Sequence, residues 1–403
     1  MAKKVVLAGA CRTAIGKMGG ALGTTPAPVL GSIVIKEALK RAGVPADQVD
    51  HVYMGCVIQA GLGQNVARQA SIKAGLPVET PAVTVNVVCG SGLNCVNMAA
   101  QMIQAGDADI VVAGGMENMS MAPYAMMNGR YGYRMNNGTL VDTMVNDALW
   151  DAFNQYHMMI TAENIADQWK LTREELDEFS VNSQQKCEKA ISEGKFDDEI
   201  VPVPVKVKKE IVDFVKDEGP RPGTTIEALA KLKCCSGKKE GGVVTAGNAS
   251  GINDGASFMI VVSEDALKKY NLTPMCEVVG IGQGGVDPTV MGLGPTPAIL
   301  NALKDANITI EDLDLVELNE AFASQSLGVI HELVEATGMD REKFMEKTNV
   351  NGGAIALGHP VGASGNRILV TLIHEMAKRD AKLGLASLCI GGGMGTAVIV
   401  KRA

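Results

Sequence analysis

Short apolar runs alternate with segments of helical periodicity along most of the chain. The runs VVLAG from Val5, VTVNVV before Cys89 and ASFMIVV from Ala256 are rich in β-branched residues, which is typical of strands. The segment that follows Cys89 instead repeats its apolar residues at helical spacing. This alternation predicts an α/β fold in which mixed or parallel sheets are covered by helices.

One pattern of helix, turn and strand occurs twice. The segment from Ala38 to Gly55 aligns without gaps with the segment from Ala302 to Asn319, which lies 264 residues later. Ala, Leu, Lys, Ala, Asp and Val recur at equivalent places, and some mismatches are conservative, such as Val44 against Ile308. Coincidental similarity within one large α/β domain is the weaker interpretation, so the pattern favours an internal duplication.

A second match fixes the limits of the two copies. Residues 89–116 and 362–394 both run from a glycine-rich turn through a helical pattern to an apolar strand that ends in glycines. The later copy continues directly into the strand TAVIVKRA, whereas the similar strand ASFMIVVSE of the first copy begins only at Ala256. We therefore predict one half from residues 1–118 plus 249–270, an inserted domain at 119–248, and a second half at 271–403.

The inserted region differs from the two halves in its residue composition and in its pattern of apolar positions. It contains the stretch GRYGYRMNNGTL, rich in glycine, asparagine and tyrosine, and then a strongly helical segment in which Thr172 is placed to cap REELDEF. A long excursion beside a compact core commonly builds a substrate wall or an oligomer contact. The sequence does not separate these two roles.

Composition and charge narrow the class of protein. The chain has 403 residues, 46% of them hydrophobic, and a formal net charge of −8 from acidic and basic residues mixed along most of its length. We expect a soluble globular protein that does not bind nucleic acid. The first apolar run is too short for a signal peptide, and no apolar stretch approaches membrane-spanning length, so we expect a cytoplasmic protein without a membrane contact.

Nine cysteines are scattered without a paired metal-binding spacing or the framework of a small secreted domain. We expect reduced thiols and no metal site. Cys89 differs from the others because it stands where a strand pattern changes to a helical one. Free N–H groups and the positive end of a helix dipole lower the pKa of a thiol, which predicts a nucleophile at this position. The alternative is an inert cysteine packed in the core.

Three further segments in the second half combine reactive side chains with glycines: NEAFA from Asn319, GHPVGASG around His359, and CIGGGMG from Cys389. Each has an ordinary structural explanation, as a turn amide, a loop histidine or a buried strand end. The approximate two-fold axis of a duplication, however, brings corresponding strand ends together near Cys89. A thiol, an imidazole and a second thiol can supply a nucleophile, a base and another acid or base. Asn319 and glycine N–H groups can act as oxyanion donors.

Five motifs, in this order and spacing, make the chain resemble the thiolase family over essentially its whole length: NVVCGSG, GNASGIND, NEAFA, GHPVGASG and CIGGGMG. The resemblance implies duplicated α/β halves in five layers (α-β-α-β-α) with an inserted loop domain for coenzyme A (CoA) binding and oligomer contacts. It also implies a homotetramer built as a dimer of dimers. Acetyl-CoA, acetoacetyl-CoA and coenzyme A would be the substrates, with no metal or redox cofactor.

The resemblance further implies the activity of an acetyl-CoA C-acetyltransferase. Cys89, assisted by His359, would attack an acyl-CoA thioester and become acylated. Cys389 would take the α-proton from a second acetyl-CoA, and the carbanion would attack the acyl group in a Claisen condensation that is reversible by thiolysis. His359 and a water bound by Asn319 would stabilise the enolate, while the N–H groups of Cys89 and Gly391 would receive the acyl oxyanion.

The resemblance also predicts the contacts of the substrate. YHMMITAEN would place His157 and Met158 in the pocket, with Met291 packed nearby, and these methionines would favour short acyl groups unless they are ordinary core residues. Ser250 would contact the pantetheine arm of CoA, and Arg221 its phosphates. The main alternative is a broader 3-ketoacyl-CoA thiolase of fatty-acid β-oxidation, against which His157 and Met158 argue.

The chain departs from the family pattern at two places. Met159 stands where glycine is common, and LKCCSG replaces a stretch that usually reads Leu-x-Pro-Ala-Phe and whose aromatic ring lies along CoA. We therefore expect an altered CoA wall around Cys234 and Cys235. A reversible disulfide between Cys89 and Cys389 is a further hypothesis.

Two other classes of protein are alternatives. Decarboxylative ketosynthases pair a cysteine with two histidines or with a histidine and an asparagine, and the cysteine of CIGGG argues against them. A non-catalytic acyl-CoA or lipid carrier would have a decayed site. The presence of all the reactive residues argues against a carrier.

Overall fold

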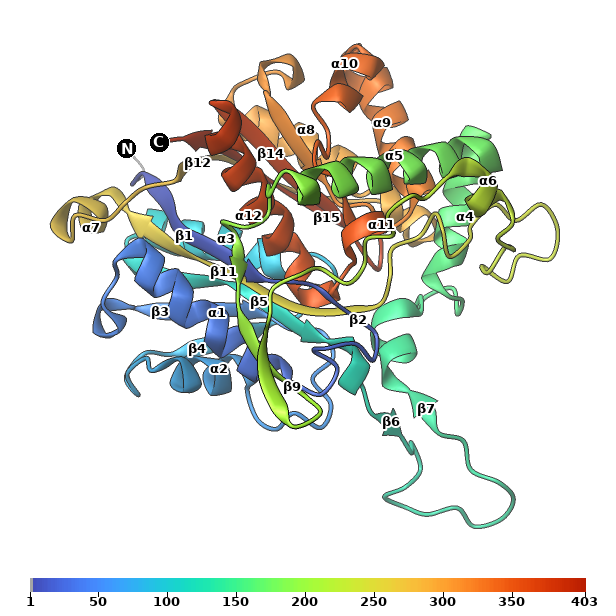
Figure 1. The fold of residues 1–403 in the computed structure, drawn as a ribbon, viewed down its shortest axis with the longest axis horizontal. Helices are drawn as coiled ribbons and strands as arrows, with labels where there is room; N and C mark the ends of the chain where they lie inside the picture. Colours follow the sequence, from blue (N-terminus) through green and yellow to red (C-terminus); the bar gives the residue numbers. More distant parts are fainter. Residues whose placement is uncertain (1–2) are drawn as a thin grey trace.

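A mixed sheet of 11 strands runs through the computed structural model, which describes residues 3–403 (Figure 1). The main path through the sheet follows the order β13-β14-β15-β12-β1-β11-β5-β3-β4, while β2 pairs with β11 and β8 with β1. The strands are Val5–Thr13 (β1), Gly16–Lys17 (β2), His51–Gly55 (β3), Ala82–Val85 (β4), Ile110–Asn118 (β5), Ile200–Val201 (β8), Asn253–Ser263 (β11), Cys276–Gly285 (β12), Leu315–Leu318 (β13), Leu383–Ile390 (β14) and Met394–Arg402 (β15).

The two halves of the sheet repeat one pairing pattern, which confirms the predicted duplication. In the first half β1 is antiparallel to β11, β11 is antiparallel to β5, and β5 is parallel to β3. In the second half β12, β15, β14 and β13 follow the same sequence of directions. The halves meet where β1 pairs with the start of β12 through only Val6 with Glu277 and Leu7 with Cys276.

Helices form three layers around the two half-sheets, as the five-layer prediction requires. The outer helices α1 and α2 pack on the first half-sheet, and α8 and α9 pack on the second. Helices α3 and α12 lie between the half-sheets and contribute to a core shared by both halves. The bounds of these helices are Ala27–Ala42 (α1), Val66–Ala74 (α2), Ser91–Ala105 (α3), Pro295–Ala306 (α8), Ala323–Thr337 (α9) and Val361–Arg379 (α12).

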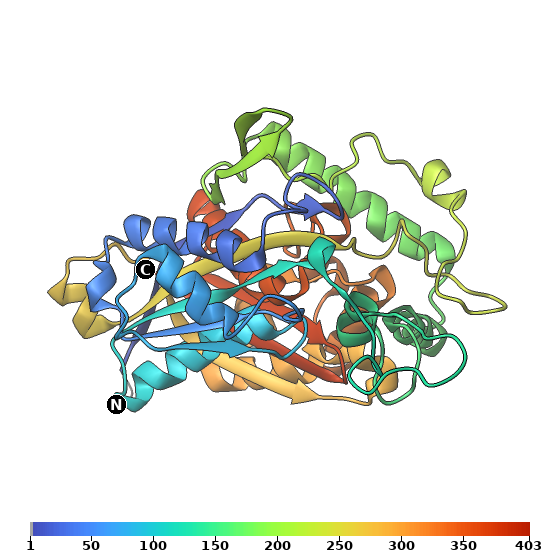
Figure 2. The same cartoon turned by 90° about the horizontal axis from the view of Figure 1, so that it is seen from below.

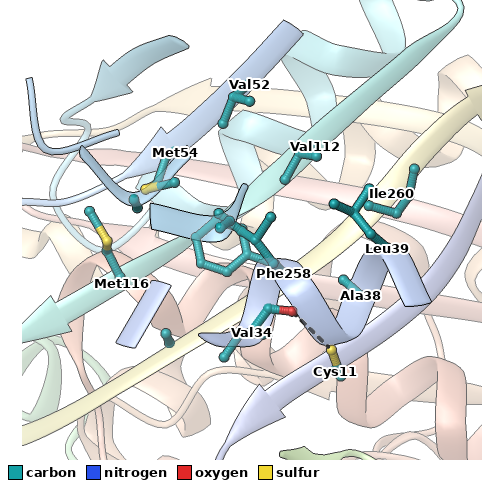
Figure 3. Packing of buried hydrophobic residues seen from close by; sticks show 14 of the residues in the cluster. Cys11, Val34, Ala38, Leu39, Val52, Met54, Val112, Met116, Phe258 and Ile260 are labelled. Carbon is teal, nitrogen blue, oxygen red and sulfur yellow. Dashed lines mark hydrogen bonds between the residues drawn. The ribbon is translucent and has the colours of Figure 1, made fainter. Parts of the chain in front are cut away.

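The apolar face of α1 packs on the first half-sheet and forms a core with it. Figure 3 shows Phe258 of β11 packed among side chains of α1 and of the neighbouring strands, including Val34 and Val52. Cys11 is fully buried there, and its thiol donates to the carbonyl of Val34 at 3.6 Å. Burial raises the pKa of the Cys11 thiol to about 12, so this cysteine is an inert core residue.

The repeated unit is reproduced residue by residue. Helix α1 ends at Ala42 and α8 at Ala306, and each is followed by a residue in the left-handed conformation, Gly43 at φ 74° and Asn307 at φ 53°. A 3₁₀ turn and then a strand follow in both copies. Asparagine tolerates positive φ better than most residues, so it can replace glycine at this helix end.

The inserted region packs along one side of the molecule, shown in green in Figures 1 and 2. Thr172 caps α5 in a capping box with Glu175, as its sequence context predicts. A loop between β6 and β7 extends away from the body (Figure 1). The elements of this region are β6 (Tyr124–Ala125), β7 (Val141–Asp142), α4 (Met158–Trp169), α5 (Arg173–Ser192), β9 (Val203–Val207), β10 (Glu210–Phe214) and α6 (Ile226–Ala230). The exact boundaries proposed for the three parts stay a prediction.

Three short helices complete the α-helical elements: α7 (Glu264–Lys269), α10 (Arg341–Glu346) and α11 (Ala354–Leu357). Within residues 3–403, no helix has both the length and the apolar character that crossing a membrane requires.

Candidate active site

A cavity of about 730 Å³ is lined by residues of both halves and of the inserted region. Eight of the ten residues predicted for the site line this cavity: Cys89, His157, Met158, Arg221, Ser250, Met291, His359 and Gly391. The other two, Asn319 and Cys389, are completely buried and are not part of the cavity surface.

Cys89 lies in a tight turn between β4 and α3, as the change of periodicity predicts. The preceding residue, Val88, has φ 43°, which is strained for a β-branched side chain. The hydroxyl of Ser91 braces the turn, because it accepts from the N–H of Val87 at 2.9 Å and donates to the carbonyl of Val88 at 2.6 Å. Strain of this kind is retained where the surroundings enforce it, commonly at functional sites.

The prediction of a lowered pKa for the Cys89 thiol was wrong. Burial raises this pKa to about 11 and outweighs two backbone N–H groups that lower it, those of Gly391 and of Cys89 itself. The thiol is therefore neutral at pH 7 and needs a base to become a nucleophile. Gly391 lines the same cavity as Cys89, and the use of these two N–H groups as an oxyanion hole stays a prediction.

His359 is the candidate for that base because it lines the same cavity as Cys89. Its ring Nδ1 lies 2.6 Å from the hydroxyl of Ser364, which itself donates to the carbonyl of Pro360 at 2.9 Å. The hydroxyl proton is thus used, so Nδ1 donates to Ser364 and the other nitrogen, Nε2, is left as the acceptor. Burial, with a smaller contribution from the positive charge of Arg367, lowers the pKa of His359 to about 4 and keeps the ring neutral.

His359 is also fixed through its main chain. Its backbone N–H donates to the side-chain carbonyl of Asn253 at 3.0 Å, and the amide nitrogen of Asn253 donates to the carbonyl of Gly16 at 3.0 Å. Within residues 3–403, Nε2 of His359 is buried without a hydrogen-bond partner. It is therefore available to a reacting group.

Cys389 lies at the end of β14 in an apolar cluster that also contains Met158, Met291 and Phe322. Burial raises the pKa of Cys389 well above its usual value, and the next largest cause is the charge of the Cys89 thiolate. All nine cysteines are free thiols, and a disulfide between Cys89 and Cys389 stays a prediction.

Asn319 directly follows β13, and its N–H donates to the carbonyl of Ser387 at 3.0 Å. Both polar atoms of its side-chain amide are buried and lack a hydrogen-bond partner among the described residues. Because buried amides are normally satisfied, these two atoms suit a water molecule or a substrate group. This agrees with the proposed role in oxyanion stabilisation, which stays a prediction.

Glycines allow the first turns of α3 and α12 to touch. A Cβ on Gly92 would lie 2.9 Å from the backbone N of Asn366, and a Cβ on Gly365 would lie 2.6 Å from the backbone N of Leu93. Neither position accepts a side chain without displacing the other helix. The GSG and GASG sequences thus bring two helix N-termini side by side at the cavity.

Glu117 at the end of β5 is a positioning residue that the sequence analysis missed. It is fully buried, and its carboxylate accepts from the N–H groups of Val57 at 2.9 Å, Ile58 at 3.1 Å and Gly362 at 2.9 Å. It therefore ties a loop of the first half to the start of α12 in the second. Burial raises the pKa of Glu117 to about 6. An acidic residue inside the otherwise apolar run IVVAGGMEN is the signal that could have identified it.

The cavity wall also carries two cations, Lys17 and Arg221, both exposed to solvent. Such side chains suit phosphate groups. No group of three or more histidine, cysteine, aspartate or glutamate side chains in the described part of the chain is arranged to bind a metal ion. The expectation that the protein needs no metal or redox cofactor stays a prediction.

Comparison with known proteins gives consistent results. The family model described as "Thiolase, N-terminal domain" matches residues 5–265, and "Thiolase, C-terminal domain" matches residues 272–402. The chain is 57% identical to an acetyl-CoA acetyltransferase of Syntrophomonas wolfei over 403 residues, which cover 100% of both chains. It is 56% identical to the enzyme of the same name from Cupriavidus necator over 99% of both.

Solved structures agree with these matches. The crystal structure of a Bacillus anthracis acetyl-CoA acetyltransferase superposes with a TM-score of 0.95 at 43% identity, covering 100% of this chain and 99% of that one. The crystal structure of human mitochondrial 3-ketoacyl-CoA thiolase superposes with a TM-score of 0.94 at 44% identity, with the same coverage. With both halves matched by family models and the whole chain matched by its relatives, this protein belongs to the thiolase family.

Proposed function

We propose that the protein is an acetyl-CoA C-acetyltransferase, which condenses two molecules of acetyl-CoA to acetoacetyl-CoA and CoA and catalyses the reverse thiolysis. One observation carries the proposal. The Cys89 thiol, the neutral imidazole of His359 and the backbone of Gly391 line the same cavity. This set supplies a nucleophile, a base and an oxyanion hole for a thioester.

Acylation starts with a neutral pair. His359 Nε2 takes the proton from Cys89, and the sulfur attacks the thioester carbonyl, so that a carbon–sulfur bond forms on the enzyme and the bond to CoA breaks. The leaving CoA sulfur takes a proton from Cys389, which becomes a thiolate. Removal of a single oxyanion donor typically lowers a rate by about 10²–10³.

Condensation uses the second thiolate. Cys389 takes the α-proton of a second acetyl-CoA, and the carbanion attacks the acetyl group on Cys89. The Cys89 thiolate leaves and recovers its proton from His359, which returns every group to its starting state. The raised pKa of Cys389 supports this role, because a thiolate that strongly prefers to be protonated is a strong base.

The shape and charge of the cavity support a short acyl group on CoA. Met158 and Met291 are buried in one cluster with Cys389 and line the cavity, which supports their role in limiting the acyl group. Lys17 and Arg221 supply positive charge for the phosphates of CoA, and Ser250 lines the same cavity. His157 accepts from the N–H of Met159 at 3.2 Å and begins α4 beside the cavity.

Steady-state thiolysis tests the proposal. We expect turnover of acetoacetyl-CoA and at least about tenfold lower kcat/KM for 3-ketohexanoyl-CoA, since each methylene that a pocket rejects changes the rate by about tenfold or more. Equal or better turnover of the longer substrate would instead identify a broader 3-ketoacyl-CoA thiolase of β-oxidation. Binding without turnover of either substrate would contradict the assignment.

The same proposal includes assembly and location. The loop between β6 and β7 exposes large apolar side chains, among them Met126, Met127, Tyr131 and Met135, which supports its use as an oligomer contact in a homotetramer formed as a dimer of dimers. Analytical ultracentrifugation tests this assembly.

Nine free cysteines support a reducing compartment such as the cytoplasm. CoA thioesters enter as substrates, and no metal or redox cofactor is invoked.

A further inference from the structure

Two buried arginines differ in how they are bonded. Arg12 of β1 donates to Glu199 at 2.6 Å and to the two oxygens of Asp217 at 2.7 and 3.0 Å. Arg367 of α12 is only 1% exposed, yet none of its three guanidinium nitrogens has a hydrogen-bond partner among residues 3–403. A buried charge without such bonds lowers stability, so a residue of this kind commonly has a functional role.

The counter-charge of Arg367 is Glu317 of β13. Nη1 of Arg367 lies 3.7 Å from Oε2 of Glu317, and both side chains are buried. Burial raises the pKa of Glu317, and the positive charge of Arg367 is the main opposing cause. In the described part of the chain this Oε2 has no hydrogen-bond partner either. The two residues therefore form an ion pair that joins β13 to α12 by charge.

Glu317 lies behind a residue of the candidate site. In β13, Val316 and Leu318 pack in the outer core with α8 and α9, so Glu317 points to the opposite face, toward α12. Asn319 continues the alternation on that face, because its N–H still bonds to the carbonyl of Ser387 in β14. Glu317 and Asn319 are thus neighbours on one face of the strand.

Arg367 has a corresponding place behind His359. Ser364 and Arg367 are three residues apart in α12 and share one face of the helix. The hydroxyl of Ser364 lies 2.6 Å from Nδ1 of His359. After burial, the charge of Arg367 is the second cause that lowers the pKa of His359. Arg367 therefore lies one helical turn beyond the residue that orients the imidazole.

Other charged groups lie near the pair or the start of α12. Each of them has a hydrogen-bond partner of its own: Arg12 and Glu199 bond to each other, Glu320 to Ser183, Glu375 to Asn351, Lys186 to the carbonyl of Thr348, and Glu117 to the N–H of Gly362. Their charges are thus used in local structure. The guanidinium of Arg367 differs in this respect.

We propose that Arg367 and Glu317 are positioning residues, an ion pair that supports the reacting end of the site from behind without contacting the substrate. Arg367 acts on His359 through Ser364, and its charge opposes protonation of the ring. Glu317 acts on Asn319 through β13. The proposal rests on the function proposed above and adds two residues to its machinery.

The rate of acylation by acetyl-CoA, followed by quenched intact-mass spectrometry, tests the role of Arg367. Arg367→Met should lower this rate at pH 8 by about tenfold to hundredfold, because the imidazole loses its support. The ratio of the rates at pH 5 and pH 8 should also fall about twofold relative to the wild type. The reason is that loss of the charge raises the pKa of His359 from about 4 by about one unit. Arg367→Lys should restore the ratio, since it keeps the charge.

Thr371→Val is the matched control. Thr371 is buried one turn farther along α12, and its hydroxyl donates to Glu199 at 3.0 Å. This variant should leave the rates at both pH values unchanged. The role of Arg367 is overturned if folded Arg367→Met keeps the wild-type ratio, or if Thr371→Val changes the ratio equally.

Glu317→Gln tests the other member of the pair. Condensation of the acetyl-enzyme with acetyl-CoA should slow by about tenfold, because Asn319 is expected to act on the enolate. The ratio of acylation rates at pH 5 and pH 8 should not fall, because Arg367 is still present. An unchanged rate of condensation overturns the proposal, and this holds even if Arg367→Met does not fold. Failure of the wild-type protein to become acetylated would instead contradict the proposed function.

Discussion

Two equivalent serines, Ser91 in the first half and Ser364 in the second, show how the duplicated halves have diverged. Each lies in the first turn of an inner helix and donates its hydroxyl proton to a carbonyl just before that helix. Ser91 accepts from a backbone N–H and braces the strained turn of Cys89. Ser364 accepts instead from the ring of His359 and sets its tautomer. The duplication gave both halves the same strand–turn–helix scaffold. The reactive residue just before the helix differs, and it is the nucleophile Cys89 before α3 and the base His359 before α12.

The largest expected effect distinguishes the roles of the two thiols, Cys89 and Cys389. Cys89→Ala should form no acetyl-enzyme and lose about 10⁶-fold in turnover, as is typical when a nucleophile is removed. Cys389→Ala should still be acetylated by acetyl-CoA but should fail to condense. Intact-mass spectrometry detects the acetyl group, and a coupled assay measures condensation. Condensation by the Cys389 variant at the wild-type rate would refute the division of roles.

The next effect concerns His359 and Glu117, two buried titratable residues whose pKa values shift in opposite directions on folding. The pKa of His359 falls from 6.5 to about 4 on folding, so its contribution lowers stability as the pH drops from 6.5 toward 4. The pKa of Glu117 rises from 4.5 to about 6, so its contribution lowers stability as the pH rises from 4.5 to 6. Over these pH ranges the free energy of unfolding changes by about 3 kcal/mol because of His359 and by about 2 kcal/mol because of Glu117.

Chemical unfolding of His359→Gln and Glu117→Gln between pH 4 and 7.5 measures both contributions. The first variant should lose less stability than the wild type on acidification, and the second should lose more. Shifts in the same direction for the two variants would show that the assigned pKa values are wrong.

Exchange of each serine for alanine sharpens the comparison between the halves. Ser364→Ala should lower kcat by about tenfold to hundredfold, because the imidazole loses the partner that orients it. Ser91→Ala should lower the rate of acylation by weakening the Cys89 turn. A pH profile of acylation distinguishes them, since only Ser364→Ala should change the apparent pKa of the base. Identical profiles for both variants would contradict the separate roles.

The smallest effect tests the glycine contact between α3 and α12. Gly92→Ala and Gly365→Ala should each reduce the free energy of unfolding by about 1–3 kcal/mol through overpacking. Gly285→Ala is a matched control, because its Cβ would have no neighbour closer than 3.7 Å. Urea denaturation monitored by circular dichroism gives all three values. Equal stability of the three variants would mean that the helices can move apart without cost.

Local patterns predicted much of this fold. The repeat at Ala38 and Ala302, the helix start after Cys89 and the cap at Thr172 all depend on residues close together in sequence, and the structure confirms them. The layer order followed from the family resemblance and is likewise confirmed by the packing of the helices.

Properties that depend on distant neighbours were not predictable in the same way. The pKa of Cys89 follows from burial by residues of both halves, which outweighs the local helix terminus. The role of Glu117 depends on Gly362, 245 residues later. The contact between Met159 and Cys235 joins two departures that the sequence shows only as separate oddities.

The position of β11 between β1 and β5 has a consequence for how the chain folds. Val5 of β1 pairs with Ser263 of β11, so the first half-sheet cannot close until the whole inserted region has been synthesised. The strands of the second half all lie within residues 276–402, so no long insertion separates them in the sequence. Pairing over such separations is slow and exposes strand edges meanwhile. During synthesis, β5 can pair with β3, but its other edge stays unpaired until β11 has been made. The half that contains Cys89 is therefore the one most in need of protection from aggregation.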